Sequence, residues 1–419
     1  MPGTSTDLTR LRITLTAFFA LDGFIFAGWV VRIPAIKEQT GASASTLGLA
    51  LLGVSAGAVI TMMLTGRLCH RYGNHQVTVV CAVLLSLSVS LPPLTHSPLA
   101  LGLVLLVFGA AYGGINVAFN SAAVDLVRAM RRPIMPSFHA AFSLGGMVGA
   151  GLGGLVAGVL TPTQHLFGLT VIGLLVTAVV GRNLLRLKPP TPPAPPTSPT
   201  SPTSPTTPAP SRNSPQDPPQ NSPKNSPQEK TPPHRLNPRT RGLVLTFGLI
   251  ALCTAFGEGA LADWSALHLE QDLDATAGAA AIGYSCFALA MTAGRLTGTR
   301  LLERLGRTRT LVSGGTTAAL GMLLGALAPT LWAAVLGFVI TGLGLANLFP
   351  VAVERAGTLA GPDGVAIAST LGYGGMLLGP PAIGFMADWY SLPAALTSVA
   401  VLAAVAAGIG FLTRHAAEN

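Results

Sequence analysis

The sequence predicts an all-α membrane protein in which twelve transmembrane helices form two six-helix bundles. Runs of about 20 apolar residues recur along the chain, and one long polar segment divides them into two groups of six. A helix of about 20 residues is long enough to cross a hydrocarbon core of about 30 Å. We expect helices at residues 13–34, 45–66, 76–94, 98–125, 135–160, 164–185, 242–267, 275–298, 309–327, 330–353, 364–386 and 391–413.

The composition supports a membrane protein. Half of the residues are hydrophobic, only 10% are charged, and the mean hydropathy is +0.57 even with the polar segment included. A soluble domain has a less apolar composition. The four cysteines have no paired spacing and lie in or beside separate apolar runs, so we interpret them as small core residues and expect neither a disulfide nor a zinc framework.

The polar segment, residues 188–240, contains 19 of the 33 prolines of the chain. Frequent prolines remove backbone donors and exclude helix, and a segment with so few apolar residues cannot form a core. We therefore predict a disordered Pro/Ser/Thr-rich cytoplasmic linker between an N-terminal bundle, residues 1–187, and a C-terminal bundle, residues 241–419.

The net charge of +9 is explained by the placement of the basic residues. If the amino terminus is cytoplasmic, 23 of the 25 lysines and arginines fall on the cytoplasmic side, and Arg32 and Lys37 alone fall outside. This asymmetry follows the positive-inside rule, which places both termini and the linker in the cytoplasm. The basicity therefore orients the protein, and we expect no nucleic-acid partner.

Short motifs recur in the two halves when the expected helices are followed in order. The second helix ends in a Gly66-Arg67-Leu68 triplet, and the eighth helix repeats it 228 residues later at Gly294. The fifth and eleventh helices contain Gly-Gly-Met triplets 229 residues apart, the first of them at Gly145. The nearly equal offsets predict that the second half is a duplicate of the first.

The loop after the second helix, from Gly66 through His70 and Arg71 to Gly73, resembles the Gly-x-x-x-Asp-Arg-x-Gly-Arg motif of the major facilitator superfamily. His70 and Asn74 depart from the motif, and the second copy keeps Glu303, Arg304 and Gly306. Within the superfamily, the runs beginning at Gly294, Asn347, Gly257 and Phe138 resemble the fucose-permease-like branch and its poorly characterised bacterial inner-membrane relatives. The resemblance covers both halves and implies the major facilitator fold. It also implies a conformational gating role for Gly66, Arg67, Arg71, Gly73, Arg295, Glu303, Arg304 and Gly306.

Two carboxylates are candidates for proton coupling. Asp22 lies near the middle of the first helix, where a carboxylate is costly unless it is paired, hydrated or protonated. Glu258 lies between two glycines in the seventh helix, which the resemblance places beside a central cavity. The alternatives are a structural hydrogen bond for Asp22 and a structural ion pair for Glu258, for example with Arg32.

Further polar residues are candidates for binding the solute. Asn116 and Asn120 lie four residues apart on one face of the fourth helix, and Asn347 lies in the equivalent helix of the second half. Amides both donate and accept hydrogen bonds, which suits a hydroxylated ligand, although they also bridge helices. His139 and Asp263 complete the candidates, and both have structural alternatives.

The fifth helix carries two ridges of small residues, one of them formed by Gly145, Gly149 and Gly153. Small residues allow close helix packing, so we expect this surface to let the two halves slide against one another. Gly149, Gly151 and Gly154 of this helix match a dinucleotide-binding fingerprint, but that motif requires a preceding strand and here lies in a helix.

These observations predict a secondary active transporter that moves a small polar solute, sugar-like by resemblance, across the cytoplasmic membrane by alternating access and with proton coupling. One alternative is a proton-driven exporter of a small natural product or drug. Another is a membrane sensor or scaffold that transports nothing. We expect a monomeric multi-pass protein of the inner membrane that is not an enzyme and that uses no cofactor or metal.

Overall fold

The computed structural model describes residues 5–42, 44–190, 237–275 and 277–414, and within these ranges it is built of helices without strands. Ten segments are long and apolar enough to cross a membrane. Two of them contain two crossings each, because α9 (Ala277–Leu327) is kinked at Gly306 and α11 (Leu348–Trp389) is kinked at Ala360 and Gly361. The kinks account for the difference between ten apolar segments and the predicted twelve crossings.

The remaining helices follow the predicted order closely. The first bundle consists of α1 (Ser5–Val30), α2 (Ile33–Thr40), α3 (Ala44–Tyr72), α4 (Asn74–Ser88), the 3-10 turn η1 (Pro92–Leu94), α5 (Pro98–Met130), α6 (Met135–Val156) and α7 (Pro162–Arg186). The second bundle consists of α8 (Pro238–Asp272), α9, α10 (Leu331–Leu345), α11 and α12 (Leu392–Leu412).

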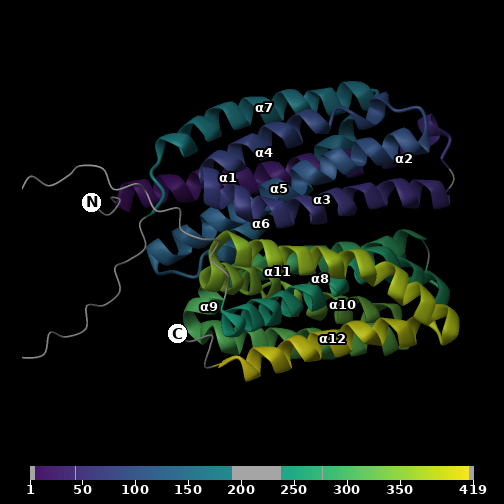
Figure 1. Ribbon diagram of the computed structural model, residues 1–419. Coiled ribbons are helices and arrows are strands. Elements are labelled where there is room, and N and C mark those ends of the chain that lie inside the picture. The colour runs from purple at the N-terminus through teal and green to yellow at the C-terminus, as the bar shows by residue number, and fades with distance from the viewer. Residues whose placement is uncertain (1–4, 43, 191–236, 276, 415–419) are drawn as a thin grey trace, which may run out of the picture.

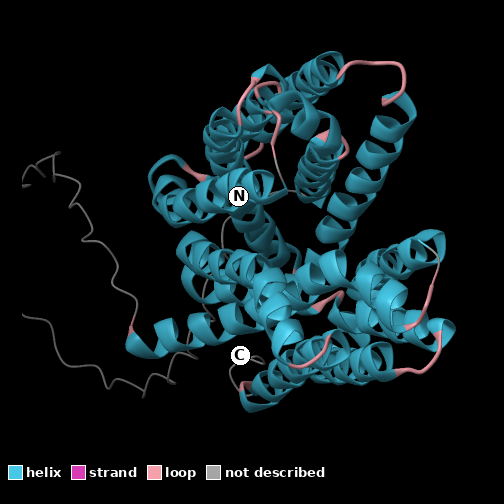
Figure 2. Cartoon of the chain, turned by 90° about the vertical axis from the view of Figure 1, so that its right-hand side faces the viewer, coloured by secondary structure: helices cyan, strands magenta, loops and turns pink. Residues whose placement is uncertain are grey.

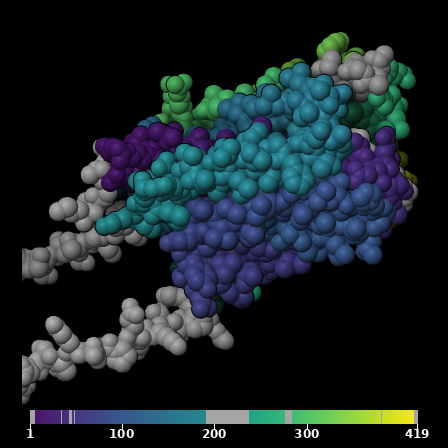
Figure 3. Space-filling view, turned by 90° about the horizontal axis from the view of Figure 1, so that it is seen from above, coloured from purple at the N-terminus to yellow at the C-terminus, as the bar shows by residue number. Residues whose placement is uncertain are grey.

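The two bundles lie side by side with their helices roughly aligned (Figure 1). The start of α1, the end of α7, the start of α8 and the end of α12 all lie at one end of the molecule, here called the terminal end, and α2 lies at the opposite, far end (Figure 1). Figure 2 views the far end and shows the bundles as two separate groups of helices. In the view from above, α7, in teal, covers much of the outer face of the first bundle (Figure 3).

Large apolar side chains cover the outside of both bundles. Leu99, Leu155 and Trp332 are each at least 70% exposed, and many other leucines, valines and isoleucines are exposed as well. An apolar surface of this extent is stable in lipid but not in water, which agrees with a membrane-spanning protein.

One short helix was not predicted. The sequence analysis extended the first crossing to residue 34, whereas α1 ends at Val30 and α2 runs separately from Ile33 to Thr40. Eight residues are too few to span a membrane. Gln39 holds α2 in place by donating from Nε2 to the carbonyl oxygens of Pro93 and Thr95, at 2.7 and 2.8 Å.

Most of the predicted linker falls outside the described residues. Its last three residues do not belong to a linker, because α8 begins at Pro238, with Asn237 as its N-cap. Proline suits the first turn of a helix, where its missing N–H would have no partner within the helix.

Glycines bring α1 and α6 into backbone contact inside the first bundle. A Cβ added at Gly145 would lie 2.0 Å from the carbonyl oxygen of Ala20, and one at Gly149 would lie 2.3 Å from that of Phe24. The expectation that this ridge lets the two halves slide is therefore wrong, because the ridge packs within its own bundle. The equivalent contact joins α8 and α11, where a Cβ at Gly375 would lie 2.2 Å from the carbonyl oxygen of Leu252.

The repeat seen in the sequence extends to side-chain contacts at the terminal end. Gly73 and Gly306 both turn the chain with positive φ, 88° and 78°. The next residue in each half donates to a carboxylate: Asn74 to Asp125 at 2.8 Å, and Arg307 to Glu354 at 2.6 Å. The turns and the helices that they join are thus built alike in the two halves.

We predict that Gly145→Ala destabilises the protein, because its methyl group would overlap the carbonyl oxygen of Ala20. Overpacking of this kind costs about 1–3 kcal/mol. Thermal unfolding in detergent should show a lower midpoint for this variant. Gly154→Ala in the same helix is the matched control, because its added Cβ would meet nothing within 4 Å. Equal midpoints for the two variants would contradict the packing described here.

Candidate functional site

Polar side chains from both bundles meet inside the protein, far from its ends. The central cluster consists of Asp22 on α1, Tyr112 on α5, Glu258 on α8, Arg295 on α9 and Tyr373 on α11. The two tyrosine rings lie 5.9 Å apart in an edge-to-face arrangement and share a hydrogen bond between their phenol groups. Both phenols interact electrostatically with Asp22 and Glu258. The contact between Tyr112 and Tyr373 therefore joins the two bundles.

Asp22 is completely buried, and neither of its carboxyl oxygens has a hydrogen-bond partner among the described residues. One turn earlier on α1, Phe19 packs against Phe119 and Phe138, with ring centroids 3.8 and 5.3 Å away. These aromatic rings keep that part of the helix apolar. A buried carboxylate without hydrogen bonds is unstable in its charged form unless a proton or a cation neutralises it. The structural alternative for Asp22, a hydrogen bond to a neighbouring helix end, is not found in the described residues.

Glu258 forms an ion pair with Arg295, whose Nη2 lies 3.2 Å from Oε2 of Glu258. Arg295 also donates from Nη1 to the hydroxyl oxygen of Ser143 on α6, at 2.8 Å. Since α6 belongs to the first bundle and α9 to the second, this arginine joins the bundles. The resemblance placed Arg295 among the gating-loop residues, but it lies inside α9 and is 7% exposed, so it belongs to the central cluster.

Arg32 is not the partner of Glu258. Its Nε donates to Nδ1 of His165 at 2.8 Å, and its Nη1 and Nη2 donate to the carbonyl oxygens of Ala157 and Val156 at 3.3 and 3.4 Å. Arg32, just after α1, thus ties the far end of the first bundle to α6 and α7.

The amide candidates make contacts within and between neighbouring helices. Asn120 donates from Nδ2 to the carbonyl oxygen and to Oδ1 of Asn116, at 2.8 and 3.3 Å. Asn347 is the N-cap residue of α11 and donates from Nδ2 to the carbonyl oxygen of Gly294 on α9, at 3.0 Å. The Oδ1 atoms of Asn120 and Asn347 are buried and have no hydrogen-bond partner in the described part of the chain.

His139 and Asp263 have different surroundings. His139 is 8% exposed and lies between Phe19 of its own bundle and Phe349 of the other, with ring centroids 5.5 and 5.7 Å away. It also interacts electrostatically with Arg295, which places it next to the central cluster. Asp263 is exposed and lies five residues beyond Glu258 on α8, so the structure leaves it outside the cluster.

Contacts at the terminal end hold the bundles together. His70 lies 3.3 Å from Asp363, and Arg132 donates two hydrogen bonds to Oε1 of Glu303, at 2.8 and 2.7 Å. Arg128 donates to the carbonyl oxygens of Gly357 and Thr358. The terminal end is therefore closed in this structure.

The predicted gating residues take different positions at this closure. Gly66 passes close to the second bundle, since a Cβ there would lie 2.7 Å from Oδ1 of Asp363, and Glu303 accepts from Arg132. Gly73 and Gly306 form the positive-φ turns. Arg67, Arg71 and Arg304 are exposed, and Arg71 lies over the ring of Tyr72 at 5.3 Å.

Sequence reasoning missed several residues that the structure brings to these places. Tyr112, Tyr373 and Ser143 were not singled out, although Tyr373 stands between two glycines, which is a recognisable signal for close approach of other backbone. Arg128 and Arg132 were counted only for their charge. Nothing in the sequence around Asp363 indicated its contact with the other bundle, because its partner His70 lies almost 300 positions earlier in the chain.

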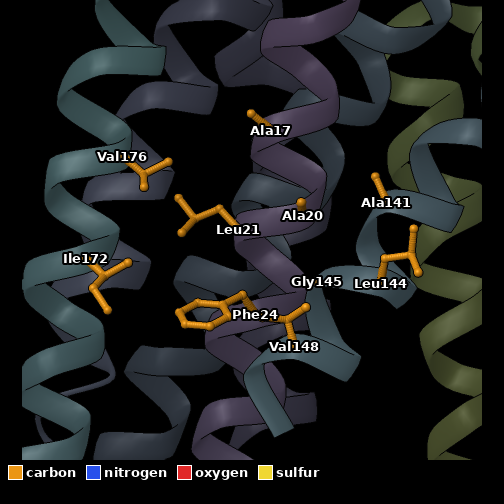
Figure 4. Close-up of a pocket in the computed structure, with 10 residues that line it drawn as sticks. All are labelled: Ala17, Ala20, Leu21, Phe24, Ala141, Leu144, Gly145, Val148, Ile172 and Val176. Carbon is orange, nitrogen blue, oxygen red and sulfur yellow. The ribbon is translucent and has the colours of Figure 1, made fainter. Parts of the chain in front are cut away.

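An open cavity of about 490 Å³ lies between α1, α6 and α7 (Figure 4). Its lining is apolar, and Leu144, Val148 and Ile172 on its wall are each more than 40% exposed on the outer surface of the bundle. A site for a polar ligand needs placed donors and acceptors, which this lining does not offer. The central cluster therefore remains the candidate site.

Among the described residues, no group of three or more histidine, cysteine, aspartate or glutamate side chains is arranged to hold a metal ion.

Comparisons with known proteins agree with this architecture. The family model of the Major Facilitator Superfamily matches residues 13–257 and 247–419. An uncharacterised MFS-type transporter of Yersinia pestis is 33% identical over 418 residues, which is 99% of this chain and 97% of the relative. An uncharacterised transporter of Sinorhizobium fredii, y4wD, is 33% identical over 397 residues, which is 94% of this chain and 95% of the relative.

Solved structures of low sequence identity share the fold. The E. coli fucose:proton symporter FucP, in the outward conformation, matches with a TM-score of 0.73 at 15% identity, over 96% of this chain and 97% of its own. The human organic anion transporter MFSD10 matches with a TM-score of 0.72 at 15% identity, over 96% of this chain and 99% of its own. At this identity the likeness concerns the fold alone.

We predict that Gly66→Ala opens the terminal end, because the added methyl group would collide with Asp363 only when the bundles are closed. Cys69 can report the opening, since its thiol is 4% exposed and interacts electrostatically with Asp363. In a background in which the other three cysteines are replaced, Cys69 should react with a maleimide roughly tenfold faster, as expected for a loss of about 1.4 kcal/mol in the closed state. Leu64→Ala, on the exposed side of α3, is the control. An unchanged rate in Gly66→Ala would show that this contact does not hold the closed state.

Proposed function

The chain belongs to the Major Facilitator Superfamily and is a membrane transporter, and we propose that it moves a small polar solute by alternating access, driven by a proton gradient. The solute site is proposed at the central cluster. In this proposal Asp22 binds the proton, and the remaining polar groups of the cluster bind the solute.

One observation carries the proposal: the carboxyl of Asp22 is fully buried inside a membrane-spanning helix and has no hydrogen-bond partner in the described residues. The charged form of such a group is costly in the membrane interior, and a proton removes the cost. When the bundles part, water reaches the group and the charged form becomes acceptable. Loading and release of a proton at Asp22 would thus follow the side to which the site is open.

The closed terminal end supports alternating access. The bundles contact each other through His70, Arg128 and Arg132 at the terminal end and through Tyr112 and Arg295 near the cluster. Opening the terminal end requires these contacts to break while each bundle keeps its own backbone-level packing. A rocking motion of two rigid bundles about the central cluster satisfies both conditions.

The groups of the cluster support a polar solute. A carboxylate, a guanidinium and two phenols offer several donors and acceptors within one region, which suits a hydroxylated molecule. The fold likeness to a fucose:proton symporter is consistent with a proton-coupled carrier of such a solute.

We further propose that the protein lies in the cytoplasmic membrane with its terminal end in the cytoplasm. The described basic residues other than Arg295, Arg32 and Lys37 gather toward this end, and Arg32 and Lys37 stand at the other. The positive-inside rule relates this distribution to orientation.

We predict that Asp22→Asn abolishes proton-driven accumulation. Purified protein in liposomes with an alkaline interior is tested with a panel of labelled sugars, polyols and sugar acids. The wild type should accumulate at least one compound above its external concentration, while Asp22→Asn should only equilibrate it, because the amide cannot carry a proton. Glu270→Gln, an exposed change at the far end of α8, is the control.

Wild-type accumulation that persists in Asp22→Asn would remove Asp22 as the proton carrier. Accumulation that persists in both Asp22→Asn and Glu258→Gln would refute proton coupling at the cluster. A wild type that binds a compound of the panel but moves none would favour the sensor interpretation.

A further inference from the structure

Arg295 has hydrogen-bond donors that find no acceptor among the described residues. It is 7% exposed, yet its guanidinium makes one hydrogen bond to Ser143 and one to Glu258, and its buried Nε has no partner among the described residues. A guanidinium has five N–H donors, and burying donors without acceptors is costly. This cation therefore has room for a further acceptor in the central cluster.

The pair with Glu258 is longer than two other arginine–carboxylate pairs of the described residues. Its N–O distance is 3.2 Å, whereas Arg307 reaches Glu354 at 2.6 Å and Arg132 reaches Glu303 at 2.7 Å. Both of the shorter pairs use two nitrogens on one oxygen, while Glu258 receives a single bond. Charge-assisted bonds are usually about 2.7–2.9 Å long. The most buried of these three arginines thus has the weakest carboxylate partner.

Glu258 is placed so that it can leave Arg295. Its side chain is 34% exposed, although it lies within the membrane-spanning part of α8. Gly257 and Gly259 on either side of it pack against Val399 and the backbone of Met376, so the room next to Glu258 lies on its exposed side. A second carboxylate can therefore approach the guanidinium from the open side of the cluster.

We propose that Arg295 binds a carboxylate group of the transported solute, and that Glu258 occupies the guanidinium when no solute is bound. This inference rests on the proposed function, because it assigns a solute class to the same site. The solute class is a hydroxylated carboxylic acid, such as a sugar acid. Its hydroxyl groups would meet the phenols of Tyr112 and Tyr373.

The charge balance of the exchange requires one proton. In the free state the negative charge of Glu258 neutralises Arg295. When the solute carboxylate takes that place, Glu258 is left as an uncompensated charge inside the membrane and is neutralised by binding one proton. The net charge of the site, counting the bound carboxylate of the solute, is zero before and after, so one proton is taken up with each carboxylate.

The other groups that face Glu258 cannot supply this neutralisation. Tyr284 on α9, Tyr112 on α5 and Tyr373 on α11 interact with it, and phenols carry no positive charge. α10 and α12 also pack against α8, and neither contains a titratable residue. Arg355 on α11 lies over Phe247, three turns of α8 before Glu258, so Arg295 is the cation that is paired with Glu258.

The test compares matched neutral and carboxylated probes: D-galactose with D-galacturonate, D-glucose with D-glucuronate, and D-glucitol with D-gluconate. Binding to purified protein in detergent is measured by calorimetry at one pH. In at least one pair the carboxylated probe should bind the wild type more than tenfold more tightly than its neutral partner. Arg295→Gln should weaken that binding on the order of 10- to 100-fold, the usual effect of losing a charged hydrogen bond.

Two further variants keep the test valid if Arg295→Gln folds poorly. Arg295→Lys keeps the charge but loses the planar fork, so it should bind the carboxylated probe with intermediate affinity. Glu258→Gln with Arg295→Gln removes both buried charges together and should fold without a preference for the carboxylated probe. Arg300→Gln, an exposed arginine on the same helix, is the control and should bind like the wild type.

Measuring proton uptake on binding distinguishes protonation of Glu258 from protonation of Asp22. In weakly buffered solution, binding of the carboxylated probe should take up one more proton per molecule in the wild type than in Glu258→Gln. Asp22→Asn should take up one more proton per molecule than Glu258→Gln, as the wild type does, because Glu258 is intact.

Absence of tighter binding for every carboxylated probe, or binding that Arg295→Gln leaves unchanged, would overturn the assignment of Arg295. Proton uptake that Glu258→Gln leaves unchanged would overturn the exchange at Glu258. Accumulation of a neutral sugar with no carboxylate preference would refute this inference and leave the proposed transport intact. Carboxylate binding at Arg295 without gradient-driven accumulation would leave this inference intact and refute the proposed coupling.

Discussion

The cost of charge inside the membrane is the constraint on which the rest of this structure depends. Ionisable side chains within the helices are either paired, as Glu258 is with Arg295, or left without a hydrogen-bond partner, as Asp22 is. Arg295 ties its pair to the first bundle through Ser143, Asp22 interacts electrostatically with the two tyrosines that join the bundles, and the outer surface is covered by apolar side chains. The chain therefore concentrates its costly groups in one region that the bundles share, and solvent access to that region depends on how the bundles are placed.

Backbone packing determines which parts of the molecule can move. The glycines of α6 press against α1, and Gly375 of α11 presses against α8, so that each bundle is tied internally at distances that leave no room for a side chain. Contacts between the bundles are instead made by side chains such as Arg132, His70 and Arg295. Side-chain contacts break at far lower cost than close-packed backbones, so motion is expected between the bundles and not within them.

The two halves share a design but differ in charge. At the terminal end, Asn74 meets Asp125 in the first bundle and Arg307 meets Glu354 in the second. The amide of Asn74 is neutral, so the charge of Asp125 is balanced by Arg128, 3.7 Å away. Arg128 also donates to the carbonyl oxygens of Gly357 and Thr358 in the other bundle. The departure of the first loop from the superfamily motif thus ties the acidic residue of one bundle to the contact between both.

The sequence by itself determined the membrane-spanning helices, their number and the similarity of the two halves. These follow from local properties, namely the length of apolar runs, the helix-breaking prolines and a repeated offset, which do not depend on what packs against what. It also pointed to Asp22 and Glu258, because a carboxylate in an apolar run is unusual wherever the run lies. Only the tertiary structure decided that Glu258 pairs with Arg295 and not with Arg32, that the glycine ridge of α6 packs inward, and that Tyr112 meets Tyr373. These contacts join residues tens to hundreds of positions apart, and which partner is reached depends on how each helix is rotated within its bundle, a property set by all of its neighbours at once.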